Sequence, residues 1–272
     1  MIDWTRGYST TWRISRVDPI TWASMGEVPS VVEASYSADA TTDAVETASA
    51  KCAIPFGSEP PVGWLRIEAL VEQGAVAEHV TVCTMRFDAG RSTWEGGYRT
   101  LSLEGVSSLY PASEAEELPD GAWSGPTANG AERAASLIDP HTPAPVYVDG
   151  SYRIDEGTVY DLDSTPLAAA LSIVPEGWAV RPDAYGAVHV MPVSAPVTRF
   201  GTADRGMFLT SASSDSDGRI TYTRQWGPGL RVHDAIGLKL PELGLDGDYR
   251  IVRQNVTCGS RITVEETVEA IA

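Results

Sequence analysis

Lysine and cysteine are both scarce in this 272-residue chain. Lys51 and Lys239 are the only lysines among 20 basic residues, and the 3 cysteines are Cys52, Cys83 and Cys258. An odd number of cysteines without a CxxC pair argues against a disulfide framework and against a structural zinc site. We therefore expect three free thiols buried in the core.

Long apolar runs are also missing. Every window of about 18 residues contains charged or turn-forming residues, so the sequence predicts no membrane-spanning helix and no membrane partner. The first six residues, MIDWTR, lack the basic start and apolar stretch of a signal peptide. Export by that route is not expected.

The motifs that announce catalysis or cofactor binding are absent as well. The sequence has no GxSxG elbow, no GxGxxG turn and no phosphate-binding Walker loop. Its four histidines are scattered, and the calcium-loop fragment Asp215-Ser216-Asp217-Gly218 lacks the third acid and the distal glutamate. We predict no catalytic residue, no metal and no cofactor, and expect that the protein is not an enzyme.

Negative charge, by contrast, is abundant. The chain has 37 acidic and 20 basic residues, a net charge of −17, and the excess is spread over both halves. A field of this sign disfavours tight adhesion to nucleic acid or to anionic lipid. It remains compatible with a protein past which DNA slides without sticking.

The first 110 residues are typical of short antiparallel strands. Apolar and polar residues alternate in each segment, and Gly- and Pro-rich turns separate them. The predicted strands are Thr11–Val17, Val32–Ser37, Ala48–Ile54, Trp64–Val71, His79–Phe87 and Tyr98–Val106. Their spacing predicts an antiparallel barrel or sandwich.

Residues 111–192 have a different texture, because prolines interrupt every long element. The pattern predicts one helix over Ala128–Ile138 with Thr127 as its N-cap. It predicts a second helix that Thr165 caps and that begins at Pro166. A turn over Asp183–Gly186 and a strand over Ala187–Pro192 follow. We interpret this stretch as a connector.

Residues 193–272 return to strands, with three sets of side chains predicted to share a face: Ile220, Tyr222, Arg224 and Trp226; Tyr249, Ile251 and Arg253; and Ile262, Val264, Glu266 and Val268. The predicted fold class is mainly β (α+β). The predicted domains are a first β module (1–110), a connector with helices and a hairpin (111–192), and a second β module (193–272).

Two acidic clusters are the candidate functional residues. Glu114, Glu116 and Glu117 lie in a proline-bounded polar loop, and Glu265 and Glu266 lie on a strand near the C-terminus. A solvent-facing strand edge explains the second cluster better than a pair of hydrolase carboxylates does. The eight tryptophans leave open an alternative, a carbohydrate-binding or glycan-active β protein. Their scatter along the chain favours packing instead.

The order of the segments resembles that of bacteriophage tail hub proteins, which are also described as baseplate hub or tail-associated minor tail proteins. The resemblance covers nearly the whole chain but contains no diagnostic motif. The segments that carry it are Val32–Tyr36, Ala48–Pro55, Gly63–Ala69, Arg99–Leu109, Ser164–Leu171, Pro175–Trp178, Asp183–Val190, Tyr222–Trp226, Leu230–Asp234 and Gly247–Ile251.

This resemblance implies two tube-like antiparallel β barrels, joined by a small connector with two short helices. It implies a homotrimeric ring at the phage tail tip, assembled in the bacterial cytoplasm. The implied partners are the distal tail protein, a tail fibre or spike, the tape-measure protein, and double-stranded DNA that passes without specific binding. Some acids would then face the channel or a subunit interface, and the candidates are Glu114, Glu116, Glu117, Glu265 and Glu266.

Overall fold

The structure is a computed structural model of the chain, and strands dominate it, as predicted. It describes residues 1–28, 31–40, 45–55, 57–95, 97–116, 118, 129–155, 163–193, 198–201, 204, 208–215, 219–227 and 229–271. In this described part, no helix is both long enough and apolar enough to cross a bilayer.

Seven strands form in the first part of the chain, where six were predicted. They are β1 (Ser9–Val17), β2 (Ser24–Val28), β3 (Val31–Asp39), β4 (Thr47–Pro55), β5 (Gly63–Gln73), β6 (Val76–Glu95) and β7 (Tyr98–Val106). Alternate side chains of β4 and β5 are buried, as the period of two requires. The additional strand, β2, is almost entirely exposed and so has no apolar alternation that could predict it.

The middle of the chain holds the helices and a small sheet. Its elements are α1 (Tyr110–Glu114), α2 (Gly130–Ile138), the 3-10 turn η1 (Asp139–His141), β8 (Val146–Val148), α3 (Pro166–Ser172), β9 (Trp178–Pro182) and β10 (Val188–Pro192). The predicted cap of α3 is confirmed, because Thr165 Oγ1 accepts a hydrogen bond from the Ala168 amide at 3.2 Å. Helix α2 is capped by Asn129, whose Oδ1 accepts from the Glu132 amide. The cap predicted for it, Thr127, lies outside the described residues.

The last part of the chain is again built of strands. They are β11 (Thr198–Gly201), β12 (Leu209–Ser214), β13 (Ile220–Gln225), β14 (Ala235–Leu240), the 3-10 turn η3 (Pro241–Leu243), β15 (Leu245–Cys258) and β16 (Ile262–Ala270). One predicted face needs correction. The pairing of β15 with β16 shifts register between Ile251 and Arg253, so Arg253 points to solvent while Tyr249 and Ile251 are buried.

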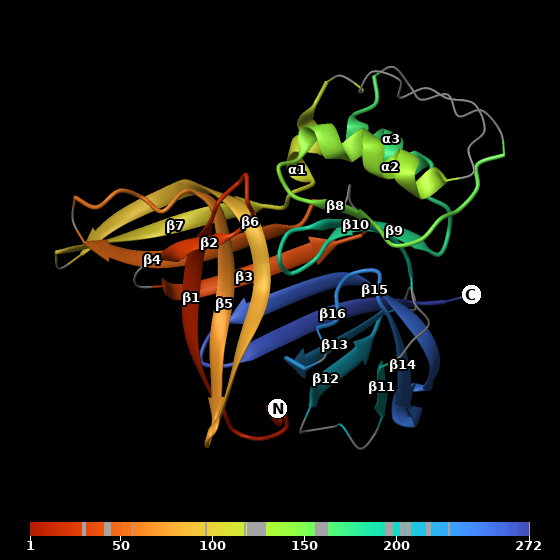
Figure 1. The fold of residues 1–272 in the computed structure, drawn as a ribbon. Coiled ribbons are helices and arrows are strands. Elements are labelled where there is room, and N and C mark those ends of the chain that lie inside the picture. The colour runs from red at the N-terminus through yellow and green to blue at the C-terminus, as the bar shows by residue number, and fades with distance from the viewer. Residues whose placement is uncertain are drawn as a thin grey trace.

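A single sheet joins the two ends of the chain. Its strands follow the order β12-β13-β16-β15-β3-β4-β7-β6-β5-β1-β2, with β14 and β11 branching from β15. The junction is the antiparallel ladder between β3 and β15, which pairs Ala34 with Cys258 and Asp39 with Arg253 (Figure 1). The strand pairing is therefore one continuous path. This path does not test whether either part of the sheet closes into a barrel, so the two barrels implied by the resemblance stay a prediction.

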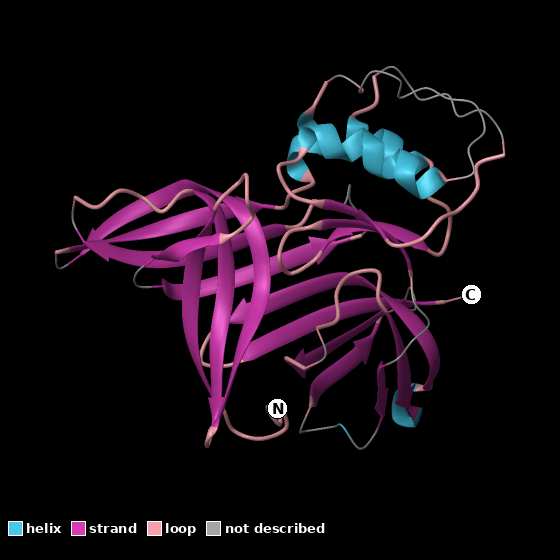
Figure 2. Ribbon diagram, viewed as in Figure 1, coloured by secondary structure: helices cyan, strands magenta, loops and turns pink. Residues whose placement is uncertain are grey.

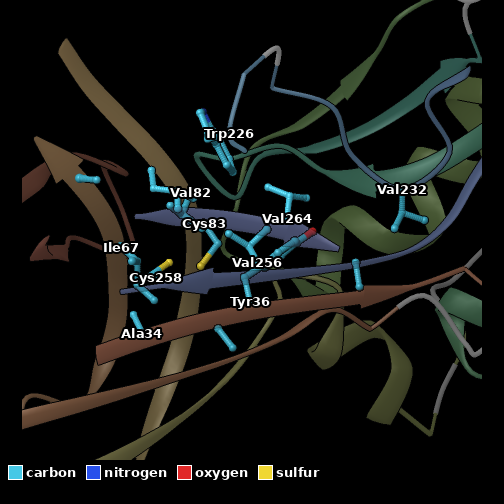
Figure 3. Packing of buried hydrophobic residues seen from close by; sticks show 14 of the residues in the cluster. Ala34, Tyr36, Ile67, Val82, Cys83, Trp226, Val232, Val256, Cys258 and Val264 are labelled. Carbon is cyan, nitrogen blue, oxygen red and sulfur yellow. The ribbon is translucent and has the colours of Figure 1, made fainter. Parts of the chain in front are cut away.

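The hydrophobic core is likewise shared between the two ends of the chain. Figure 3 shows Val82 and Cys83 of β6 beside Val256 and Cys258 of β15, and all four belong to one buried cluster. Along the sheet β6 is four strands away from β15, so these side chains meet across the apolar side of a curved sheet. The division into three domains stays a prediction.

A smaller layered unit sits on one side of the large sheet. Helices α2 and α3 lie together over the three-stranded sheet β8-β10-β9, and their apolar sides form a second buried cluster with it (Figure 2). The turn between β9 and β10 fastens this unit to the first strands. Trp22 Nε1 donates to the Tyr185 carbonyl at 2.7 Å, and Ser108 Oγ donates to the Gly186 carbonyl at 2.7 Å.

Candidate functional site

The outer face of the large sheet is polar across strands from both ends of the chain. We call this surface the polar face. It consists of the partly or fully exposed side chains on β13, β16, β15, β3, β4 and β7 that point away from the core. Its members are Thr221, Thr223, Gln225, Thr263, Glu265, Thr267, Glu269, Arg253, Asn255, Thr257, Glu33, Ser35, Ser37, Asp39, Thr47, Ser49, Lys51, Ser102 and Glu104.

The strand registers align these side chains in rows that cross the sheet. One row crosses all six strands of the face and continues onto β6. Each member is the direct cross-strand partner of the next: Gln225, Thr263, Thr257, Ser35, Ser49, Glu104 and, on β6, Asp88. Because opposing side chains in a sheet lie about 5 Å apart, such a row forms a connected strip of hydroxyl and carboxyl groups. The strip crosses the junction between β3 and β15 without a break.

Hydrogen bonds between neighbouring strands hold several of these side chains in place. Ser35 and Ser49 share a hydrogen bond of 2.8 Å between their hydroxyls, and Ser37 Oγ donates to Asn255 Oδ1 at 2.7 Å. Asn255 in turn donates to Glu265 Oε1 at 3.4 Å. The second of these bonds links β3 to β15, so the face is tied together across the junction of the chain's two ends.

Negative charge dominates the polar face. Its members include five carboxylates, from Glu33, Asp39, Glu104, Glu265 and Glu269. The cations on the same strands are Lys51, Arg253 and Arg250, the cross-strand partner of Glu269. Two of the carboxylates are in ion pairs: Asp39 with Arg253 at 2.5 Å, and Glu269 with Arg219 at 2.9 Å. The unpaired excess of negative charge comes from Glu33, Glu104 and Glu265. A hollow of ≈ 160 Å³ lies at this end of the face, beside Asp39, Thr221 and Thr267.

Directly behind the face, the core contains a charged group that was expected at the surface. Glu266 is 0% exposed, and its two carboxylate oxygens accept from Arg224 Nη2 at 2.7 Å and Arg224 Nε at 2.8 Å. Gln254 Nε2 donates to the same carboxylate at 2.6 Å. A carboxylate enclosed in this way faces neither a channel nor a neighbouring subunit, so Glu266 is removed from the candidates.

The other predicted acids are dispersed. Glu265 is exposed and belongs to the polar face, whereas Glu114 and Glu116 are exposed at the end of α1, in the helical unit. Glu117 lies outside the described residues. The two predicted clusters therefore occupy different parts of the molecule, and whether any of these acids lines a channel stays a prediction.

A second buried polar group lies where the three parts of the chain meet, and sequence reasoning missed it. Arg231 Nη1 donates to Tyr36 Oη at 3.2 Å, and its Nη2 donates to the Val82 carbonyl at 2.5 Å. Arg181 of the small sheet forms an ion pair with Asp234 at 2.8 Å. These contacts connect the first strands, the helical unit and the last strands.

Two titratable groups at this junction have shifted pKa values. Burial raises the pKa of Glu46 to about 7, although the charge of Arg231 acts in the opposite direction. Burial, together with the charges of Arg181 and Arg250, lowers the pKa of His233 to about 4. Both groups line a small cavity of ≈ 10 Å³, about the space of one water molecule.

The thiols are buried, and the described tryptophans include a packed pair. All three cysteines are free and buried, and burial raises the pKa of Cys52 to about 11 and that of Cys83 to about 12. Among the residues that the structure describes, no three His, Cys, Asp or Glu side chains are grouped to hold a metal ion. Trp22 packs on Trp64 with ring centres 5.0 Å apart, which is a packing role.

No family model and no curated protein sequence matches this chain. Solved structures do. The 43 kDa tail protein of prophage MuSo2 from Shewanella oneidensis has a TM-score of 0.69 at 10% identity, with 97% of this chain and 98% of that chain covered.

Two further structures extend the likeness. The tail protein from Neisseria meningitidis MC58 has a TM-score of 0.66 at 12% identity, covering 97% of this chain and 96% of that one. The Escherichia coli c3393 protein, described as a type VI secretion component similar to the phage T4 tail proteins gp27 and gp5, has a TM-score of 0.57 at 7% identity and covers 89% and 74%. The resemblance predicted from the sequence is thus confirmed at the level of the fold: this chain has the fold of phage tail proteins.

Proposed function

We propose that this protein is a structural component of a phage tail tip. Three copies form a ring that joins the tail tube and distal tail protein to a fibre or spike. The polar face lines the channel of that ring, and double-stranded DNA passes along it. The protein performs no reaction of its own. The protein is located in the virion.

The observation that carries this proposal is the continuity of the polar face across the two ends of the chain. The row from Gln225 to Asp88 crosses the junction of β15 and β3 as if it were any other strand pair. A binding pocket would concentrate its polar groups at one place. An extended strip of hydroxyl, amide and carboxyl groups instead suits a long, uniform object such as a duplex.

The charge of the face supports the passage of DNA. Duplex DNA carries about one negative charge per 1.7 Å of its axis, so a lumen rich in lysine or arginine would retain it. The face has five carboxylates against the cations of Lys51, Arg250 and Arg253, and the chain as a whole has a net charge of −17. Electrostatic repulsion between the carboxylates and the phosphates keeps the duplex away from the channel wall. The hydroxyl groups of the wall form hydrogen bonds with water, so the wall stays hydrated.

The fold likeness supports the setting. Proteins described as phage tail proteins share this fold over nearly their whole length. A type VI secretion component described as similar to phage T4 tail proteins shares it too. A position in a tail assembly is therefore the role that agrees with both the face and the fold.

Electron cryomicroscopy of the purified protein, combined with light scattering, tests the proposal. We expect particles with the mass of three chains, and a ring whose inner wall is formed by β13, β16, β15, β3, β4 and β7. A protein that stays monomeric up to the highest soluble concentration would contradict the ring. So would a ring whose inner wall is formed by the helical unit.

A further inference from the structure

Two of the three free thiols face each other across the core. Cys83 lies on β6 and Cys258 lies on β15, and each is 1% exposed. In Figure 3 their sulfur atoms point toward one another. Burial raises the pKa of Cys258, and the charge of Cys83 raises it further, an effect that acts between neighbouring groups. The two thiols are therefore neighbours, although β6 and β15 belong to the first and last parts of the chain.

The third thiol has a different setting. Cys52 lies on β4, where it is the direct cross-strand partner of Leu101. It is as deeply buried as the other two, and burial alone raises its pKa. The core thus contains a pair of thiols and a single thiol of similar burial, and the single thiol is a matched control for the pair.

The closed core keeps the pair unreactive. Burial raises the pKa of Cys83 to about 12. The thiolate form, which attacks disulfides, is therefore scarce at neutral pH. Reaction requires an opening that brings water and a small reagent to the sulfur atoms.

The position of Cys258 at the last residue of β15 makes a local opening sufficient. The turn that follows it is attached to β1 through two side chains. Trp12 Nε1 and Thr10 Oγ1 donate to the Gly259 carbonyl at 2.8 Å and 3.2 Å. Release of these bonds would admit a small reagent without unfolding of the whole sheet, because strand ends open at a lower free energy than the centre of a ladder does.

We propose that Cys83 and Cys258 are a modification site: a low-molecular-weight disulfide such as glutathione disulfide converts them into a disulfide bond that joins β6 to β15. The bond closes a loop that contains almost two thirds of the chain. Because a cross-link over a long loop removes many conformations from the unfolded chain, it stabilises the folded state. The bond locks together the same two parts of the chain that the ladder between β3 and β15 connects.

The reaction proceeds in two exchange steps. The thiolate of one cysteine attacks a sulfur atom of the reagent, breaks its S–S bond and releases one small thiolate. The second cysteine attacks the protein sulfur of this mixed disulfide, which forms the bond between Cys83 and Cys258 and releases the second small thiolate. The two cysteines lose two electrons, which the reagent gains, and their two protons end on the released thiolates.

The setting in which the bond forms rests on the proposed function. A virion assembles in the reducing cytoplasm and meets an oxidising environment after its release from the cell. The chain thus folds and assembles with free thiols, and the bond forms later, in the finished particle. The bond itself does not require a ring.

Mass spectrometry of the full-length protein tests the pair. The reduced wild type is treated with glutathione disulfide at about pH 8, both in urea below the unfolding transition and during refolding from urea, so that a closed core cannot hide the thiols. We expect the mass to fall by that of two hydrogen atoms, and a proteolytic digest to contain a peptide with Cys83 linked to a peptide with Cys258. Oxidation should raise the midpoint of thermal unfolding by about 10 °C.

Alanine variants supply the control. C52A removes the single thiol, so it should form the bond and gain the same rise in midpoint as the wild type. C258A removes one member of the pair and leaves two thiols, as C52A does. Its mass should not fall by two hydrogen atoms, and its midpoint should not rise on oxidation.

The outcomes separate this inference from the proposed function. A wild type that keeps three free thiols under both conditions would overturn the pair, and so would a C258A variant that loses two hydrogen atoms as readily as C52A. Light scattering of the same samples reports on the ring. Monomers that contain the bond would support the pair and contradict the ring, whereas trimers that do not form it would overturn the pair and leave the ring intact.

Discussion

Arg224 and Glu266 form the most enclosed ion pair of the molecule's described part, with side chains that are 1% and 0% exposed. Removing water from both charges is expensive, and the bidentate contact together with the hydrogen bond from Gln254 offsets that cost. The pair is therefore stable only as a pair. A single substitution leaves one charge in the core without its counterpart.

We expect E266Q to lower the free energy of unfolding by about 3–5 kcal/mol, because the Arg224 guanidinium remains buried. R253A, which removes the half-exposed ion pair with Asp39, should cost at most about 1 kcal/mol. Urea unfolding of both variants measures the difference. Equal losses in the two variants would contradict the enclosure of the core pair.

The junction cavity places two groups with opposite pH dependence side by side. The pKa of Glu46 is raised to about 7, so the folded state binds this proton more tightly, and its contribution to stability is lost as the pH rises from about 4.5 to 7. The pKa of His233 is lowered to about 4, so its contribution is lost as the pH falls from about 6.5 to 4. In the intact protein the two effects oppose each other.

Single substitutions should reveal the separate contributions of Glu46 and His233 to the pH dependence of stability. Relative to the wild type, E46Q should become more stable as the pH rises from about 4.5 to 7. H233N should become relatively more stable as the pH falls from about 6.5 to 4. Asparagine suits this position because His233 has φ 75°, a left-handed conformation that asparagine tolerates. Denaturant midpoints measured across pH 4–8 give the slopes, and parallel curves for all three proteins would refute the assignment.

Part of this burial of charged residues was predictable from the sequence. The alternation placed Arg224 and Glu266 on otherwise apolar faces, which is where the structure has them, but the interpretation of Glu265 and Glu266 as a solvent-facing cluster was wrong for Glu266. It did not show that they meet, because their contact depends on the register between β13 and β16. Glu46 gave no signal at all: its burial comes from strands that are distant in sequence.

At the scale of elements, the turn between β9 and β10 attaches the helical unit to the first strands through hydrogen bonds. Gly186 has φ 85°, and a Cβ there would lie 3.0 Å from the Thr84 carbonyl oxygen and 3.0 Å from the Trp22 ring. Gly177 has nearly the same backbone, φ 82°, with open space around it. Substitution of Gly177 would therefore introduce backbone strain alone, whereas substitution of Gly186 would introduce backbone strain and a steric clash.

We expect G177A to cost about 1–2 kcal/mol, the strain of a left-handed alanine. G186A should cost about 1–3 kcal/mol more, because the methyl group also pushes the turn away from Trp22 and Thr84. Thermal unfolding compares the two. Equal shifts in midpoint would mean that the turn is not held tightly against the first strands.

Strand periodicity predicted most elements well and their irregularities poorly. Tyr98–Val106 is correct at both ends, since nothing interrupts its alternation. The predicted His79–Phe87 is too short, because β6 continues to Glu95 in an exposed ribbon without apolar alternation. Arg253 was assigned to the wrong face because one irregularity in register shifts every later side chain.

At the scale of the whole molecule, the polar face makes a testable statement about DNA. Thr257, Ser35 and Ser49 are consecutive cross-strand partners in the middle of the face. Replacing all three with arginine creates a cationic strip. We expect this variant to retain duplex DNA at low salt and to release it as salt rises, whereas the wild type should not retain DNA at any salt concentration.

The matched control carries three arginines at exposed positions of the helical unit: Ser136, Ser151 and Ala168. It changes the net charge by the same amount and should leave duplex DNA unretained. Gel retardation across a salt series measures both variants. Equal retention would show that net charge, and not the placement of charge on the face, decides the behaviour.

The joining of the two ends of the chain lay beyond prediction from this sequence. A period of two shows which side of a strand is buried, but it does not show which strand lies beside it. Both β3 and β15 read as ordinary half-buried strands. Their pairing, and with it the connection of both ends of the chain in one sheet, was therefore not predicted.

The ladder between β3 and β15 also dictates when the protein can fold. Ala34 of β3 pairs with Cys258 of β15. The ladder between these strands can therefore form only after most of the polypeptide has left the ribosome. Until then the nascent chain exposes a bare strand edge and half of a core, and chaperones have the longest access at that stage. A truncated product that stops before β15 would keep that edge open and should aggregate.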